Sequence, residues 1–153
     1  MSTTHILVTP APDCPALGAE VPPAKAKPTR ANIEYDLLTQ APYTLDHLAF
    51  THAVHLAMAE ASGRPALDYA HFHARGQACM RASPLTKRYG WAAHYDAAGK
   101  LALVDPGSAA YAALAADPEL PTAPAMRSKR VRGTPCSGPG PTRPPPASTG
   151  SRR

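Results

Sequence analysis

The chain has 153 residues, of which 18% are charged and 19 are proline, and all of its aromatic residues lie between Tyr35 and Tyr111. Residues 127–153 carry seven basic side chains and no acidic one, whereas residues 1–126 carry nine basic and eleven acidic ones. The net charge of +5 therefore comes from the last 27 residues, and bulk charge does not support a basic folded nucleic-acid domain. No apolar run approaches the roughly 18 residues of a membrane-spanning helix, and the N-terminus lacks the pattern of a secretory signal.

The first predicted element is a short strand at residues 5–9, where the sequence His-Ile-Leu-Val-Thr favours β structure. Because Pro10 follows at once, with Pro12 and Pro15 soon after, we expect this strand at the edge of a sheet. Residues 11–28 contain many prolines and few large apolar side chains, which predicts an irregular or polyproline-like segment on the surface.

Helices are expected between residues 29 and 76. Thr29 is the predicted cap of a helix at residues 30–40 that leaves Glu34 and Asp36 outside, although the alternation of apolar residues there also fits a strand. Thr44 or Asp46 is expected to cap a second helix that runs to about residue 61 and exits at residue 63. A third helix is predicted from residue 65 to about residue 74, with a glycine at residue 76 to end it.

The next stretch predicts a short helical turn and two strands. Ser83 before Pro84 is typical of a capped turn, which Gly90 ends. Residues 91–95 and 100–104 are predicted to be strands joined by a turn with glycine, and an alanine-rich helix follows residues 107–108. Prolines at 118, 121 and 124 are expected to end regular structure.

These elements predict an α+β fold. We expect a single small domain at residues 3–130, with several short helices and a C-terminal β-hairpin. Residues 131–153 are rich in proline, glycine and arginine and almost devoid of apolar side chains, which predicts a disordered basic tail.

The densest group of polar residues lies in residues 75–91, which read Arg-Gly-Gln-Ala-Cys-Met-Arg-Ala-Ser-Pro-Leu-Thr-Lys-Arg-Tyr-Gly-Trp. A capped helical turn presents free backbone N–H groups that attract phosphate or carboxylate. The candidate ligand-binding side chains are three cations, two hydroxyls and one ring for stacking: Arg81, Lys87, Arg88, Ser83, Thr86 and Trp91, with Tyr89 as the alternative ring. Our leading hypothesis is a binding module for a small anionic, phosphate-bearing ligand. The alternative is that the cations pair with carboxylates and Trp91 belongs to the core.

Two further functions compete with anion binding. Cys79 is a candidate catalytic thiol for a redox or nucleophilic enzyme, with His94 or His71 as its base, although most free cysteines are buried small apolar residues. A nucleic-acid or protein-interaction module would instead use Lys87, Arg88 and the basic residues 127–130, because a basic tail attracts polyanions in a salt-sensitive way.

The cysteines and histidines indicate neither disulfides nor a metal site. Three cysteines at residues 14, 79 and 136 are far apart and odd in number, which favours reduced thiols and a cytoplasmic location. His52 and His55 can share a helix face, but no metal-binding motif accompanies the seven histidines, so we expect them to face solvent. No cofactor is indicated.

The stretch at residues 75–91 resembles the signature of a family of small uncharacterised bacterial proteins that contain a domain of unknown function. Members of that family read Gly-Gln-Pro-Cys and then Ser-Pro-Leu-Thr-Lys-Arg-Tyr-Gly-Trp-Gly, so this chain departs from them at Ala78 and Ala92. The resemblance extends over residues 3–130 and implies that the rest is an extension outside the shared domain. It implies no activity.

Overall fold

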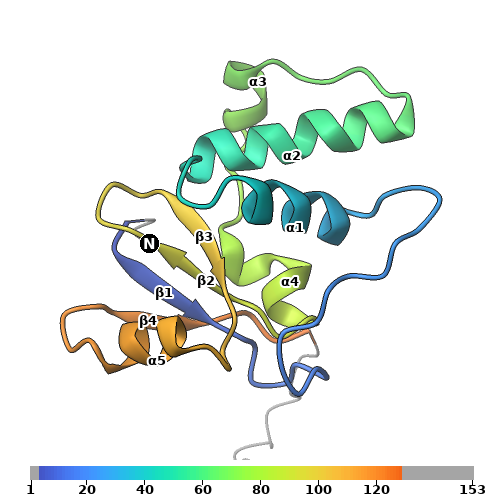
Figure 1. The fold of residues 1–153 in the computed structure, drawn as a ribbon. Coiled ribbons are helices and arrows are strands. Elements are labelled where there is room, and N and C mark those ends of the chain that lie inside the picture. Colours follow the sequence, from blue (N-terminus) through green and yellow to red (C-terminus); the bar gives the residue numbers. More distant parts are fainter. Residues whose placement is uncertain (1–3, 129–153) are drawn as a thin grey trace, which may run out of the picture.

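The computed structural model describes residues 4–128, in which strands and helices form an α+β fold (Figure 1). The elements in chain order are β1 (Ile6–Thr9), α1 (Arg30–Gln40), α2 (His47–Ser62), α3 (Tyr69–His73), the 3-10 helix η1 (Met80–Ala82), α4 (Pro84–Lys87), β2 (Ala92–Tyr95), β3 (Leu101–Val104), α5 (Ala109–Ala116) and β4 (Thr122–Pro124). None of these helices has the length and apolar character needed to cross a bilayer. The predicted boundary at residue 130 and the predicted tail lie outside the described residues.

The strands form one mixed sheet in the order β3-β2-β1-β4. Strand β1 runs antiparallel to β2, with Val8 opposite Ala93, and parallel to β4, with Val8 opposite Ala123. Strand β2 also pairs antiparallel with β3, and a turn at residues 96–99 connects the two. The predicted edge position of β1 is therefore wrong, because β1 has a neighbour on each side.

The prolines after β1 end the strand without placing it at an edge. The N–H of Leu7 donates to Pro121 O at 2.9 Å, and the N–H of Ala125 donates to Thr9 O at 2.9 Å, so residues 121–125 complete the side of β1 that faces away from β2. The expectation that prolines end regular structure after residue 118 is also wrong. Pro124 is tolerated because β4 is the edge strand, where a missing N–H breaks no ladder.

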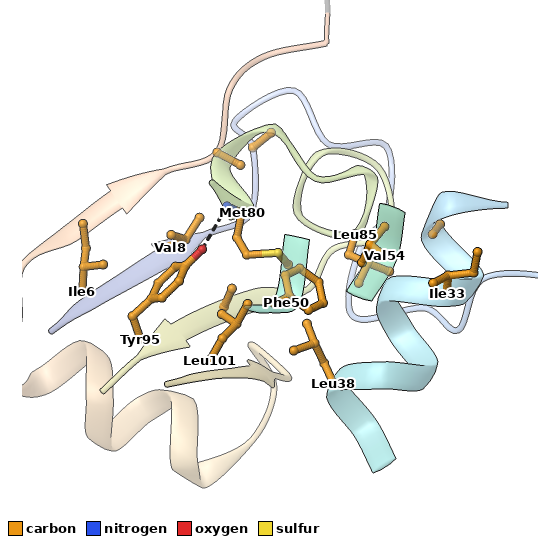
Figure 2. Close-up of a cluster of buried hydrophobic side chains, with 14 residues drawn as sticks. Ile6, Val8, Ile33, Leu38, Phe50, Val54, Met80, Leu85, Tyr95 and Leu101 are labelled. Atoms are coloured by element: carbon orange, nitrogen blue, oxygen red, sulfur yellow. Dashed lines mark hydrogen bonds between the residues drawn. The ribbon is translucent and has the colours of Figure 1, made fainter. Parts of the chain in front are cut away.

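Both faces of the sheet are covered, which suits the uninterrupted apolar run of β1. Ile6 and Val8 belong to the larger core, which the sheet forms with α1, α2 and α4 (Figure 2). Leu7 points to the other face, where a smaller cluster with Ala92, Val104 and Leu120 packs against α5. Figure 1 shows α1 and α2 on one side of the sheet and α5 on the other.

The two long helices begin and end where their local signals predict. Thr29 caps α1 by accepting the N–H of Asn32, whose side chain accepts the N–H of Thr29 in return. Asp46 caps α2, which ends at Gly63 in the left-handed conformation with φ of 63°. The predicted third helix begins later than expected, at residue 69, because Asp68 supplies its cap.

One prediction for α1 is wrong. Asp36 is exposed as expected, but Glu34 is only 1% exposed. Its carboxylate accepts the Arg30 Nε–H at 2.7 Å and the Ser83 hydroxyl proton. A buried carboxylate needs such partners, and these two allow Glu34 to connect α1 with the start of α4.

Residues 10–28, which we call the strap, run along α4 and the start of β2. The N–H of Ala11 donates to Thr86 O at 2.9 Å, and the N–H of Glu20 donates to Tyr89 O at 2.8 Å. At its far end the strap reaches α1, where the Asn32 amide donates to Pro23 O at 3.0 Å. The irregular strap is therefore held by hydrogen bonds rather than by regular structure.

Candidate functional site

The segment at residues 75–91, expected to carry the site, runs from the end of α3 through η1 and α4 to the start of β2. It contacts α1 on one side and the strap on another. Its N–H groups and hydroxyls therefore lie where the segment meets α1 and the strap, and their hydrogen bonds decide which of them can reach a ligand.

Ser83 and Thr86 lie inside the protein. Ser83 caps α4 by accepting the N–H of Leu85 at 3.1 Å, and it gives its own hydroxyl proton to Glu34. The Thr86 hydroxyl hydrogen-bonds to the carbonyls of Met80 and Ser83. Both side chains are almost fully buried, so their hydroxyls serve the fold of the segment and do not face solvent.

The three predicted cations have different surroundings. The Arg81 Nε–H donates to Pro124 O at 2.7 Å, and the Arg81 carbonyl accepts the N–H of Met126, so this residue joins η1 to the end of β4. Lys87 is half-buried in the last turn of α4, and Arg88 directly after it is exposed. Arg88 lines a cavity in the described structure.

That cavity has a volume of about 400 Å³ and is lined by Asp13, Pro15, Arg88 and Ser128. The N–H of Ser128 donates to Asp13 Oδ2 at 2.9 Å, which fixes the carboxylate at the wall of the cavity. The backbone N–H of Arg88 donates to Pro84 O at 2.9 Å, but its guanidinium forms no hydrogen bond or ion pair with any group of residues 4–128. The cavity thus offers an unpaired guanidinium and a carboxylate, an arrangement that sequence alone did not suggest because Asp13 lies in the strap.

Trp91 holds the strap in place. Its indole Nε1–H donates to Glu20 O at 2.7 Å, and its ring packs on Tyr35 with centroids 5.6 Å apart. Trp91 is half-buried and packs beside the main core. Its exposure is therefore intermediate between that of a core residue and that of a ring free to stack on a ligand.

Cys79 is a free, half-buried thiol directly before η1. Neither predicted base bonds to it. His94 shares a hydrogen bond of 2.9 Å with the Tyr43 hydroxyl, and His71 pairs with Asp68 at 2.7 Å on the exposed side of α3. No histidine in the described range forms a hydrogen bond with Cys79, so the thiol chemistry predicted for this residue gains no support from its contacts.

Tyr95 contacts the residue that follows Cys79. Its hydroxyl accepts the N–H of Met80 at 3.1 Å (Figure 2). Burial raises the pKa of Tyr95 above its ordinary value, and the charges of Cys79 and Glu34 raise it further. The phenol is therefore neutral at physiological pH and acts as an internal hydrogen-bond partner.

The expectation that the histidines face solvent is wrong for the contact between α2 and α3. His52 and His55 are half-buried there and pack with Phe72 and His73. His47, at the start of α2, is 9% exposed, and its Nε2 contacts Gln77 O at 3.3 Å. Burial lowers the pKa of His47 below its ordinary value. Spacing on α2 indicated that His52 and His55 share a face, but it could not show that α3 covers them.

Within residues 4–128, no group of three or more histidine, cysteine, aspartate or glutamate side chains is arranged to hold a metal ion. The histidines between α2 and α3 instead contact rings and backbone groups, such as Leu67, whose N–H donates to His55 at 2.9 Å. Their role in the described structure is therefore to pack α3 against α2.

Comparison with known proteins places the chain in a family whose function is unknown. A family model described as "Family of unknown function (DUF6157)" matches residues 1–131. No curated protein and no solved structure matches the chain. The match confirms the resemblance to an uncharacterised domain family that residues 75–91 suggested.

Proposed function

We propose that this chain, which belongs to that family of unknown function, is a binding module for a small anionic ligand. The proposed site is the cavity of about 400 Å³ beside Arg88. The single observation that carries the proposal is the exposed Arg88 guanidinium, which lines this cavity and has no acidic partner among the described residues. An arginine in that state binds phosphate or carboxylate with two parallel N–H donors.

Asp13 narrows the class of ligand. Its carboxylate lines the same cavity and would repel a bare anion, while Oδ2 is held in place by the N–H of Ser128. A carboxylate oxygen accepts more than one hydrogen bond, so a ligand that turns its anionic group to Arg88 and a hydroxyl or amino donor to Asp13 Oδ2 forms favourable contacts with both side chains. A sugar phosphate or a nucleotide has this combination of groups, which agrees with the phosphate-bearing ligand predicted from the segment.

The proposal assigns the residues of the 75–91 segment different parts. Arg88 contacts the ligand, while Ser83 and Thr86 act inside the protein by fixing α4, the helix that Arg88 follows. Lys87 is half-buried in the preceding turn and adds positive charge near that site.

Thermal shift measurements test the proposal with inorganic phosphate, a sugar phosphate and a nucleoside monophosphate. We expect saturable stabilisation that is larger for the two organic phosphates, because a ligand that binds only the folded state stabilises it by mass action. Arg88→Gln should abolish the saturable part, whereas Arg64→Gln, which changes an exposed arginine at the end of α2, should leave it unchanged. Equal stabilisation of wild type and both variants would contradict the proposal, since excluded anions stabilise all folded proteins alike.

Asp13→Asn gives a second readout. Removing the carboxylate should strengthen binding of inorganic phosphate and reduce the preference for ligands with hydroxyl groups. Unchanged preference among the three phosphates would show that Asp13 does not face the ligand.

A further inference from the structure

A second cavity, of about 230 Å³, lies between the start of α1, the middle of α2, and α3 with the loop that follows it. Its apolar lining comes from Val54, Met58 and Phe72. Phe72 is held in place by stacking on His55, with ring centroids 4.5 Å apart and an angle of 22° between the planes. The cavity is separate from the one beside Arg88, with which it shares no lining residue.

Arg30 brings a positive charge to the lining of this cavity. Its Nε–H donates to Glu34 at 2.7 Å, and its side chain is 51% exposed and forms no further hydrogen bond with the described residues. One N–H is thus used to orient the guanidinium, and the pair of terminal Nη groups keeps its four donors. Glu34 does not line the cavity, and its other oxygen accepts the Ser83 hydroxyl proton.

His55 adds a second donor. Its Nε2 accepts the N–H of Leu67 at 2.9 Å, and a backbone N–H can only donate. The neutral imidazole therefore carries its proton on Nδ1. This nitrogen forms no hydrogen bond with residues in the described part of the chain, and it is not among the buried polar atoms left without a partner. His55 thus supplies an accessible N–H as well as a stacking surface.

The remaining polar residues of the lining are Thr51 and Gln77. The Thr51 hydroxyl donates to His47 O at 2.9 Å within α2, and the Gln77 Nε2–H donates to Phe72 O at 3.0 Å and so helps to hold α3. The cavity therefore combines an apolar wall with a guanidinium and an imidazole N–H. This pattern is complementary to a carboxylate that carries an apolar body. Since a cavity of about 150 Å³ holds benzene, a ring with one carboxylate fits the available volume.

We propose that the pocket between α1, α2 and α3 binds a small aromatic or branched aliphatic carboxylate of the size of benzoate. The carboxylate meets the terminal N–H groups of Arg30, and the apolar body lies against Val54, Met58 and Phe72. This ligand differs in class from the phosphate ligand of the Arg88 cavity, and its binding does not depend on that function.

The test is a titration of the full chain with benzoate, followed by ¹⁵N–¹H NMR, with benzamide as the uncharged ligand of the same shape. We expect saturable shifts centred on the amides of Val54, Met58 and Phe72, and binding of benzamide weaker by about tenfold or more, because charge-assisted bonds to arginine are lost. Absence of saturable shifts with benzoate, equal binding of benzamide, or shifts centred on Arg88 would each overturn the proposal.

Two variants locate the donors. Arg30→Lys keeps a positive charge next to the buried Glu34 but removes the planar pair of donors, and His55→Phe keeps the stacking on Phe72 but removes the Nδ1–H. Each should weaken benzoate binding by about tenfold with little change for benzamide. Arg64→Lys and Arg88→Gln are the matched controls and should bind benzoate as the wild type does. Wild-type affinity in both Arg30→Lys and His55→Phe would refute the assignment, and a variant that fails to fold leaves the decision to the ligand pair on the wild type.

Discussion

Substitution of Gly90 by alanine should detach the strap from the rest of the fold. Gly90 has φ of +74° and is buried, and a Cβ added to it would lie 2.2 Å from the carbonyl oxygen of Gly18. Real Cβ atoms essentially never come so close to another heavy atom, and here the neighbour is backbone rather than the end of a flexible side chain. Alanine at this position therefore meets both an unfavourable backbone conformation and a collision with the strap.

The cost has two separable parts. The left-handed conformation alone costs an L-residue about 1–2 kcal/mol. If the strap moves away from the new methyl group, the bonds from Glu20 N–H to Tyr89 O and from the Trp91 indole to Glu20 O are lost, each worth about 1 kcal/mol. The total expected loss in the free energy of unfolding is about 3–4 kcal/mol, the sum of these contributions.

Gly63→Ala is the matched control. Gly63 has nearly the same φ, +63°, but no heavy atom lies within 4 Å of the position that a Cβ would take there. It should therefore lose only the conformational part, about 1–2 kcal/mol. The contrast between the two variants measures the contact between Gly90 and the strap.

Urea denaturation of the wild type and both variants gives the free energies of unfolding, and the fluorescence of Trp91 reports on the strap. Trp91 is the single tryptophan of the chain and donates its indole N–H to the strap, so its emission should shift to the red in Gly90→Ala and stay unchanged in Gly63→Ala. Equal destabilisation of the two variants, with the same tryptophan emission as wild type, would refute this account of the contact.

Three further substitutions probe buried polar groups. Tyr95→Phe removes the acceptor of the Met80 N–H and should lower the free energy of unfolding by about 1–3 kcal/mol in urea denaturation, because a buried donor is left unpaired; no loss would show that water replaces the phenol. Ser83→Ala removes both the cap of α4 and a donor to Glu34, so we expect the free energy of unfolding to fall by about 1–3 kcal/mol in the same assay. A loss of only about a few tenths of a kcal/mol would contradict this expectation. The pKa of His47 in the folded state lies below its ordinary value of 6.5, so the unfolded chain binds more protons at this residue, and stability should fall as the pH drops below that value. His47→Gln should flatten this part of the pH dependence of stability. An identical pH profile in the variant would exclude His47 as its source.

Local signals predicted the helices well because caps and exits act over a few residues. Thr29, Asp46 and Ser83 are caps as expected, and Gly63 ends α2 in the left-handed conformation. The third helix shows the limit of such rules, because two signals for its start lie within four residues, a proline at residue 65 and a capping aspartate at residue 68. The helix begins after the aspartate, at residue 69, and not at the proline.

Long-range contacts account for most of what the sequence could not show. Strand β4 is three residues long, and only its pairing with β1 makes it a strand. Glu34 looks like an exposed helical residue until Ser83, from a distant part of the chain, donates to it. The same limit applies to the site: the segment around residues 75–91 was predicted as its centre, but burial of Ser83 and Thr86 and the position of Asp13 in the Arg88 cavity depend on packing.

The central position of β1 has a consequence for synthesis of the chain. Val8 pairs with Ala93 on one side and with Ala123 on the other, so β1 lacks its first partner until β2 has been synthesised and its second until β4 has been synthesised. An unpaired strand with an apolar Ile-Leu-Val run is a template for association with other chains. Nascent or truncated chains that stop before Thr122 keep one side of β1 open, and they should depend on chaperones in a way that the completed chain does not.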